Sequence, residues 1–99
     1  MSHVKLIAAI PRKPGVPLQE FHDHWRHPHG TMARHIGTIR KYWQSHQLPR
    51  PLLDDRQSRY EGIAEAWMDS AADALAIAIE PVYVADVQPD ELNFIDVAH

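Results

Sequence analysis

The chain has 99 residues, with no cysteine, eight histidines and a net charge of −3 when the histidines are neutral. Its length allows a thin core, so we expect residues 1–99 to form a single domain that gains stability from a partner subunit. Without cysteine it has no disulfide or thiolate chemistry, which fits a cytoplasmic protein. The negative charge and the absence of a basic stripe argue against electrostatic nucleic-acid binding.

The beginning of the chain predicts a strand rather than a targeting segment. No apolar run approaches the roughly 20 residues of a membrane span, so we expect no membrane association. The opening MSHVKLIAAIPRKPG has an apolar run of about seven residues and no small-residue cleavage site, so we expect no signal peptide. That run, Val4 to Ile10, is closed by Pro11 and the turn-forming RKPG, which predicts a buried strand.

The next segment has the apolar spacing of a helix. Leu18, Phe21 and Trp25 are three and four residues apart, which is the stripe of an amphipathic helix. Pro28 removes a backbone donor and disfavours helical geometry at the residue before it, so the helix should break or kink there. A second helical piece is expected over residues 30–37.

Two aromatic-rich segments alternate apolar and polar side chains and predict two further strands. They cover residues 39–47 and 60–68, and a polar loop over residues 48–59 joins them. An alanine-rich helix follows Asp69 or Ser70, either of which is a good N-cap.

The end of the chain does not decide where, or whether, a fourth strand forms. Pro81 should end the alanine-rich helix, and residues 82–87, VYVADV, have strand composition but also suit a short helical turn. Residues 93–98, NFIDVA, fit a short closing strand. The expected fold is α+β and ferredoxin-like, β-α-β-β-α with or without a fourth strand, and one antiparallel sheet carries helices on one face. A homodimer would bury the other face.

Four segments in this order resemble the EthD-like family of dimeric α+β barrel proteins: KLIAAIPRKPG, EFHDHWRHPHG, KYWQSH and YEGIAEAWMDS. The resemblance runs from Lys5 to about Asp96. Two features depart from the family, since Pro28 precedes His29 where members usually carry a proline shortly after this histidine, and the family's final strand has no clear counterpart. Either that strand is displaced into residues 82–87, or the chain is a shortened form with an unpaired sheet edge.

The resemblance implies an activity without fixing a reaction. Family members look like relatives of cofactor-free monooxygenases, polyketide cyclases, decarboxylases and muconolactone isomerase-type enzymes, and many are described as oxidoreductases. It therefore implies an enzyme without an organic cofactor that acts on a small hydrophobic or aromatic molecule. The alternative is a non-catalytic ligand-binding or accessory module in a degradation or biosynthesis pathway.

The stretch FHDHWRHPHG holds four histidines, which raises the question of a metal site. On a continuous helix they do not converge, and His22 and His29 lie about 10.5 Å apart along the axis, too far for two zinc ligands. A kink at Pro28 could bring His29 back toward His24 or His22. No cysteine or suitably spaced acid completes a site, so we expect no metal, and solvated imidazoles at His22, His24 and His27.

His29 is the leading candidate for catalysis. It continues the apolar stripe, so its imidazole is expected to point at the sheet, where its pKa is tunable and suits acid–base chemistry. The family resemblance singles out the same position. The alternative is a core histidine bonded to a backbone carbonyl. Glu65 and His46 are candidate second groups, because an acid within a central strand needs a partner, and Lys5 or His46 could supply it, catalytically or as a structural ion pair.

Alternation along the strands separates their side chains by face. Small residues at positions 62, 64 and 66 leave room for a pocket beside the first helix or, if a helix packs tightly there, for a close backbone approach. Aromatic side chains would line that pocket or fill the core, and both interpretations can hold in a small barrel. The candidate substrate-binding residues are Phe21, Trp25, Tyr42, Trp43 and Trp67.

Overall fold

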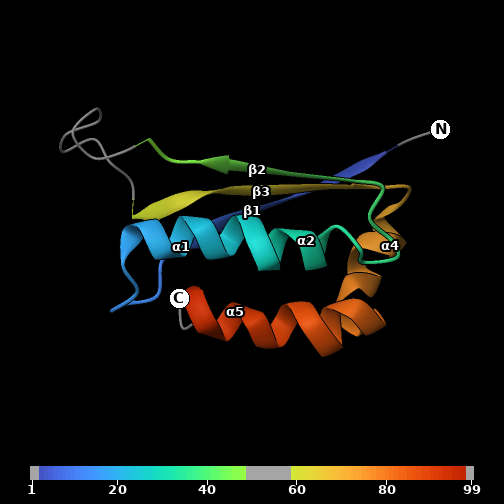
Figure 1. Cartoon of the computed structure of the whole chain (residues 1–99). Helices are drawn as coiled ribbons and strands as arrows, with labels where there is room; N and C mark the ends of the chain where they lie inside the picture. Colours follow the sequence, from blue (N-terminus) through green and yellow to red (C-terminus); the bar gives the residue numbers. More distant parts are fainter. Residues whose placement is uncertain (1–2, 49–58, 98–99) are drawn as a thin grey trace.

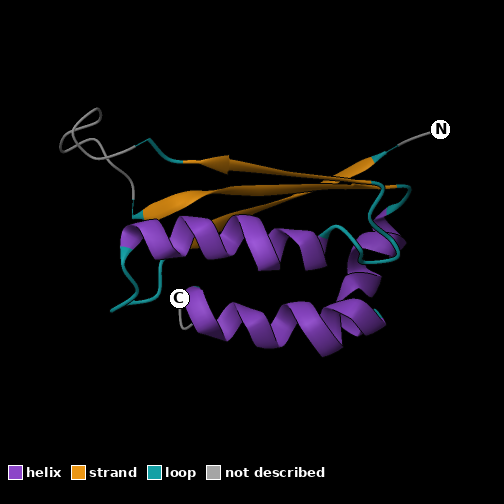
Figure 2. Cartoon of the chain, viewed as in Figure 1, coloured by secondary structure: helices purple, strands orange, loops and turns teal. Residues whose placement is uncertain are grey.

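A computed structural model describes residues 3–48 and 59–97 and shows an α+β domain (Figure 1). Three strands form one antiparallel sheet in the order β1-β3-β2. The strands are β1 (Val4–Pro11), β2 (Lys41–His46) and β3 (Tyr60–Met68). All the helices lie on one side of this sheet, and the described chain leaves the other side uncovered (Figure 2).

The helical layer has two parts. The first part consists of α1 (Leu18–His24), η1 (Trp25–His29) and α2 (Gly30–Ala33), which follow one another along the sheet. The second part consists of α4 (Ala71–Ala76), η3 (Ile77–Ile79), η4 (Tyr83–Val87) and α5 (Gln88–Phe94). The two parts meet where α5 packs against η1. Among the described residues, no helix combines the length and the apolar character needed to cross a membrane.

The predicted interruption at Pro28 is confirmed. His27 is extended, with φ −153° and ψ 129°, within the otherwise helical η1. This conformation follows from Pro28, whose ring disfavours helical geometry at the residue before it. A continuous helix would place His24 and His29 about 140° apart around its axis, whereas here both side chains bond to the same partner, Asp90.

The remaining local predictions are confirmed, and the segment left open between strand and helix is helical. All three strands form within two residues of their predicted ends. Ser70, one of the two predicted N-caps, accepts a hydrogen bond from the Asp73 backbone N–H at 3.2 Å. The alanine-rich helix ends before Pro81, and residues 82–87 are helical rather than extended. The Glu80 carboxylate accepts backbone hydrogen bonds at the start of this second helical run.

The expected closing strand does not form within the described residues. Ile95 makes only an isolated antiparallel bridge to Arg12. Phe94 is instead buried at the end of α5, seven residues after the buried Val87, because the apolar spacing of this segment is helical. The predicted loop over residues 48–59 lies outside the described residues apart from its two ends.

Aromatic rings fill the space between the sheet and the two helical parts. Phe21, Trp25 and Phe94 are each at most 1% exposed, and the Phe21 ring centroid lies 5.7 Å from Trp25 and 5.4 Å from Phe94. Full burial of one phenylalanine contributes roughly 1.5–3 kcal/mol. Gly62 on β3 permits the closest approach, since a Cβ there would lie 2.7 Å from the Trp25 ring and would collide with the Ser45 carbonyl oxygen.

We predict that Gly62→Ala destabilises the protein by about 1–3 kcal/mol, because the added methyl group must displace the Trp25 ring or the strand backbone. Gly37→Ala is the matched control, since its Cβ would approach only the flexible Glu80 side chain, at 3.0 Å. Urea denaturation followed by tryptophan fluorescence measures both variants. Wild-type stability in Gly62→Ala would contradict this packing.

Candidate functional site

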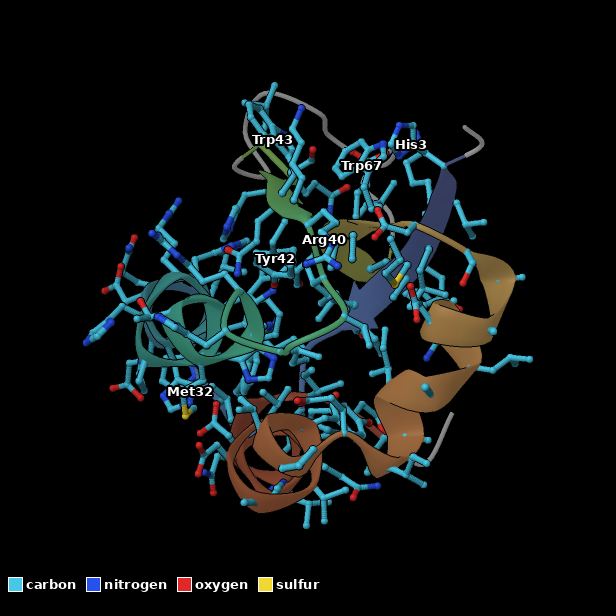
Figure 3. All side chains as sticks on the ribbon, turned by 90° about the vertical axis from the view of Figure 1, so that its right-hand side faces the viewer. His3, Met32, Arg40, Tyr42, Trp43 and Trp67 are labelled. Carbon is cyan, nitrogen blue, oxygen red and sulfur yellow. The ribbon has the colours of Figure 1, made fainter. Side chains whose placement is uncertain are left out.

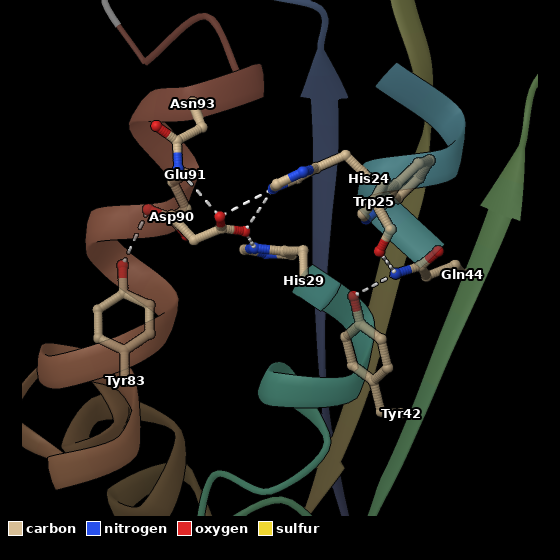
Figure 4. Close-up of polar contacts among 9 residues, drawn as sticks. All are labelled: His24, Trp25, His29, Tyr42, Gln44, Tyr83, Asp90, Glu91 and Asn93. Carbon is tan, nitrogen blue, oxygen red and sulfur yellow. Dashed lines mark hydrogen bonds and ion pairs between the residues drawn. The ribbon is translucent and has the colours of Figure 1, made fainter. Parts of the chain in front are cut away.

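A buried carboxylate on α5, Asp90, binds two histidines of the first helical part (Figure 4). His29 Nδ1 lies 2.8 Å from Asp90 Oδ2, and His24 Nε2 lies 2.8 and 2.9 Å from Oδ1 and Oδ2. Asn93 Nδ2 donates to Oδ1 at 3.1 Å. The side chains of His29 and Asp90 are only 7% and 10% exposed. We call these four residues the Asp90 cluster.

The surroundings keep Asp90 ionised and His29 neutral. Burial alone would raise the pKa of Asp90, but hydrogen bonds from Asn93, His24 and His29 outweigh it, so the pKa is lowered. Burial lowers the pKa of His29, and its bond to Asp90 offsets only part of this effect. Neutral His29 therefore donates from Nδ1 to Asp90 and carries its lone pair on Nε2.

The Nε2 atom of His29 is free to act on another molecule. It has no hydrogen-bond partner among the described residues. Among the described residues, every fully buried side-chain polar atom except Thr38 Oγ1 has a hydrogen-bond partner. Because His29 Nε2 has no partner and is not such an exception, it is accessible to solvent. His29 also lines a half-open cavity of about 120 Å³, which we call the His29 cavity. The imidazole of His29, with its basic nitrogen unpaired, thus forms part of the wall of a half-open cavity.

The His29 cavity lies between the sheet and both helical parts, and its wall is mostly apolar. Ala64 and Ala66 of β3 line it, as the pattern of small residues predicts. Its volume is slightly below the roughly 150 Å³ of an engineered cavity that holds benzene, so it accommodates about one small ring. The titratable side chains with a shifted pKa in its wall are His29, Tyr42, Tyr83 and Glu91.

Tyr83 and Glu91 form a second polar pair at this cavity. The Tyr83 hydroxyl donates to Glu91 Oε1 at 3.4 Å (Figure 4). Burial raises the pKa of both groups, and the nearby carboxylate of Glu91 raises that of Tyr83 further. A carboxyl group with a raised pKa takes up a proton more readily, so Glu91, rather than Tyr83, is the member of the pair suited to donate one.

A separate histidine pair joins α1 to β2. His22 Nδ1 lies 2.6 Å from His46 Nδ1, and His46 Nε2 lies 2.8 Å from Gln44 Oε1. Because the Gln44 oxygen can only accept, His46 donates from Nε2 and accepts at Nδ1 from His22. Burial, with a further effect of the Arg26 charge, lowers the pKa of His46 to about 4, and burial also lowers that of His22.

A family model described as the EthD domain matches residues 13–98, most of the 99-residue chain. The chain belongs to the EthD family. This finding confirms the resemblance carried by the four sequence segments. None of the curated proteins compared with this EthD chain matches it.

The EthD domain places some of the predicted binding residues at the cavity. Trp25 and Tyr42 line it together with His29. Phe21 is packed in the aromatic core with Trp25 and Phe94 instead. His46 faces the helices from the neighbouring strand, and its hydrogen bonds go to the histidine pair rather than to the Asp90 cluster.

The side chains of the other predicted residues lie on the uncovered side of the sheet, although Glu65 is also part of the cavity wall. The register pairs Trp43 with Glu65, and Trp67 follows two residues along β3 on the same face. The expectation that Trp67 lines the same pocket as the helix aromatics is wrong, because positions 62, 64 and 66 face the helices. Glu65 Oε1 binds Lys5 Nζ at 3.2 Å, one of its two predicted partners. The pair of Glu65 with His46 does not form, since the two face opposite sides.

The expectation of three solvated histidines holds only for His27, which is exposed. His22 is 9% exposed and bonded to His46, because β2 covers this side of α1. The His24 side chain is 31% exposed and bonded to Asp90, because the kink changes its relation to His29. No group of three or more His, Cys, Asp or Glu residues within the described ranges is arranged to hold a metal ion.

The sequence interpretation missed Asp90, Glu91 and Tyr83. A usable signal exists, because Val87, Asp90 and Phe94 are three and four residues apart and share one helical face. An acid on an apolar stripe marks a buried carboxylate that needs donors. The ambiguity of residues 82–87 hid this stripe, since it appears only when the segment is treated as a helix.

We predict that the protein loses stability as pH falls from about 6.5 to about 4. In this range unfolded His46 takes up a proton and folded His46, with a pKa of about 4, does not. Because the unfolded state then binds more protons, its free energy falls relative to the folded state. His46→Gln should therefore reduce the difference in unfolding free energy between about pH 7 and about pH 4.5.

Urea denaturation at both pH values measures this difference. His27→Gln is the matched control, because His27 is exposed and bonds only to Thr31 within the described residues. It should keep the wild-type pH dependence. An unchanged pH dependence in His46→Gln would show that His46 titrates alike in both states.

Proposed function

We propose that this EthD domain is an enzyme acting on a small hydrophobic or aromatic molecule of about one ring, with His29 as the group that transfers the proton. The observation that carries the proposal is that His29 lines the cavity while its Nδ1 is bound to buried Asp90 and its Nε2 has no partner among the described residues. Asp90 orients the imidazole and stabilises the imidazolium formed when Nε2 takes a proton. The lowered pKa keeps His29 ready as a base at neutral pH.

The supported chemistry is proton abstraction from an activated C–H or O–H group. The proton moves to His29 Nε2, and the electron pair stays on the substrate as an enolate or phenolate. Protonated Glu91 donates a hydrogen bond or a proton to the substrate oxygen. Isomerisation, and oxidation of the anion by O₂, both begin with this step. Decarboxylation would use His29 in the opposite sense, to return a proton to the carbanion.

The size of the His29 cavity supports a reaction without an organic cofactor. Sites for drug-sized ligands have volumes of about 300–1,000 Å³, and the cavity of about 120 Å³ lies below this range, which favours a small substrate over a flavin or a nicotinamide. In this proposal Glu65 and His46 have structural roles, as the partners of Lys5 and His22.

A second candidate function is a non-catalytic module that binds a small ligand for a partner enzyme. The small cavity favours it, because a space of one ring leaves little room for rearrangement of a substrate. The Asp90 cluster would then serve as a buried polar link between the two helical parts.

We predict that His29→Asn lowers turnover at least about 100-fold, because it removes the basic nitrogen beside the cavity. The assay screens single-ring phenols, enols and unsaturated lactones for conversion by the wild-type protein. His27→Asn is the matched control, since that imidazole is exposed, and it should retain activity. Full turnover in a folded His29→Asn variant would refute the assignment, and binding of these compounds without conversion by the wild type would favour the accessory module.

We also propose a homodimer that buries the uncovered sheet face. Figure 3 shows Trp43 and Trp67 on the far side of the sheet from the helices. Lys5 and Lys41 border this patch, with Nζ atoms 5.4 and 4.8 Å from the Trp67 ring centroid. Exposed patches of this kind mark association sites. The apolar side chains of the patch are Ile7, Trp43, Ile63 and Trp67.

We predict that Trp43→Glu converts the dimer to a monomer, because a carboxylate at the centre of the buried patch would be desolvated without a partner. Trp43 is 54% exposed in the single chain. Leu75→Glu on α4 is the control, since Leu75 is 82% exposed on the helical side, and it should stay dimeric. Sedimentation velocity measures both, and a monomeric wild-type protein would rule out the dimer.

A further inference from the structure

A second hollow, of about 400 Å³, lies between the first helical part and β2. It shares Ile39 and Tyr42 with the His29 cavity, but its character differs because its remaining wall is strongly polar. None of its described lining residues is acidic. Its cationic lining residues are Arg26, Arg34, Arg40 and Lys41, and we call it the arginine hollow.

The positive charge of the arginine hollow is opposite to that of the whole chain. The chain has 10 Lys and Arg residues and a net charge of −3, yet four of those cations line this one space. Arg26 lies 3.6 Å from Asp23, and Arg40 lies 3.0 Å from Asp69. Both ion pairs are exposed and therefore weak, so another anion can compete for these arginines.

The remaining two cations differ in how far they are engaged. The Arg34 guanidinium has no ion-pair partner among the described residues. Lys41 Nζ lies over the Trp67 ring on the uncovered face, so the three arginines supply the charge that faces the hollow. This arrangement leaves Arg34 as the cation with the most unused hydrogen-bonding capacity.

The kinked helix and β2 close the floor of the hollow. A Cβ on Gly30 would lie 2.6 Å from Gln44 Nε2 and 3.0 Å from the Trp25 carbonyl oxygen, so a larger residue there would displace the Gln44 side chain. Gln44 Nε2 donates to the Trp25 carbonyl oxygen at 2.7 Å and to the Tyr42 hydroxyl at 3.0 Å (Figure 4). These bonds hold the polar floor in place, so the hollow is a built feature of the fold.

Guanidinium groups match the paired oxygens of carboxylates and phosphates. We propose that the arginine hollow binds a small organic anion. Its carboxylate or phosphate group lies between the three arginines, and its apolar part lies against Ile39 and the Tyr42 ring. This site is separate from the Asp90 cluster and does not depend on catalysis by His29.

The proposal is tested by titrating the full chain with inorganic pyrophosphate and with malonate at constant ionic strength, which removes general screening effects. Calorimetry and the arginine Nε–Hε NMR signals should both report saturable binding at one site per chain. Arg34→Gln should weaken binding at least about tenfold, because charge-assisted hydrogen bonds are lost.

Arg59→Gln is the matched control, because it removes the same charge from an arginine that stacks on Tyr60, 4.8 Å from the ring centroid, outside the hollow. It should change affinity by less than about twofold. Arg26→Gln provides a second test if Arg34→Gln fails to fold. If pyrophosphate binds more tightly than malonate, the site prefers a phosphate group. If malonate binds more tightly, it prefers a carboxylate. No saturable binding, or equal weakening by Arg34→Gln and Arg59→Gln, would overturn the proposal.

Discussion

The hydrogen bonds to the buried Asp90 carboxylate connect the two helical parts, and the geometry of the candidate site depends on them. A buried charge deprived of its partners is destabilising by roughly 3–5 kcal/mol, so His24, His29 and Asn93 are held in fixed orientations. The kink after His27 is what allows one acid to reach both histidines. The hydrogen bond between His29 and Asp90 holds the two helical parts together and also selects the tautomer of His29. A change that weakens this packing contact would therefore also change the chemistry of His29.

The central strand β3 gives the two faces of the sheet different characters. Residues 62, 64 and 66 are small and face the helices, where they leave room for the Trp25 ring and for the His29 cavity. Residues 63, 65 and 67 are larger or charged and form the middle of the uncovered face. The nine residues of β3 thus leave space for the cavity on the helix-covered face and form the middle of an exposed patch on the uncovered face.

The features that the sequence predicts well are those determined by local chemistry. Alternation fixes the strands, and the ring of Pro28 fixes the helix interruption. The burial of His29 follows from its place on an apolar stripe. Asp90 was missed because its donors His24 and His29 are more than 60 residues away. Alternation separates Trp67 from positions 62, 64 and 66, but it does not tell which of the two faces the helices cover.

The position of β1 at the edge of the sheet affects how the protein behaves at high concentration. The strand VKLIAAIP is apolar apart from Lys5, and within the described residues only β3 pairs with it. An apolar edge strand is a template for the strand of another chain, and a single lysine is a common safeguard against such aggregation. By this rule the charge of Lys5 disfavours pairing of β1 with another chain, although the exposed ion pair of Lys5 with Glu65 adds little to folding stability.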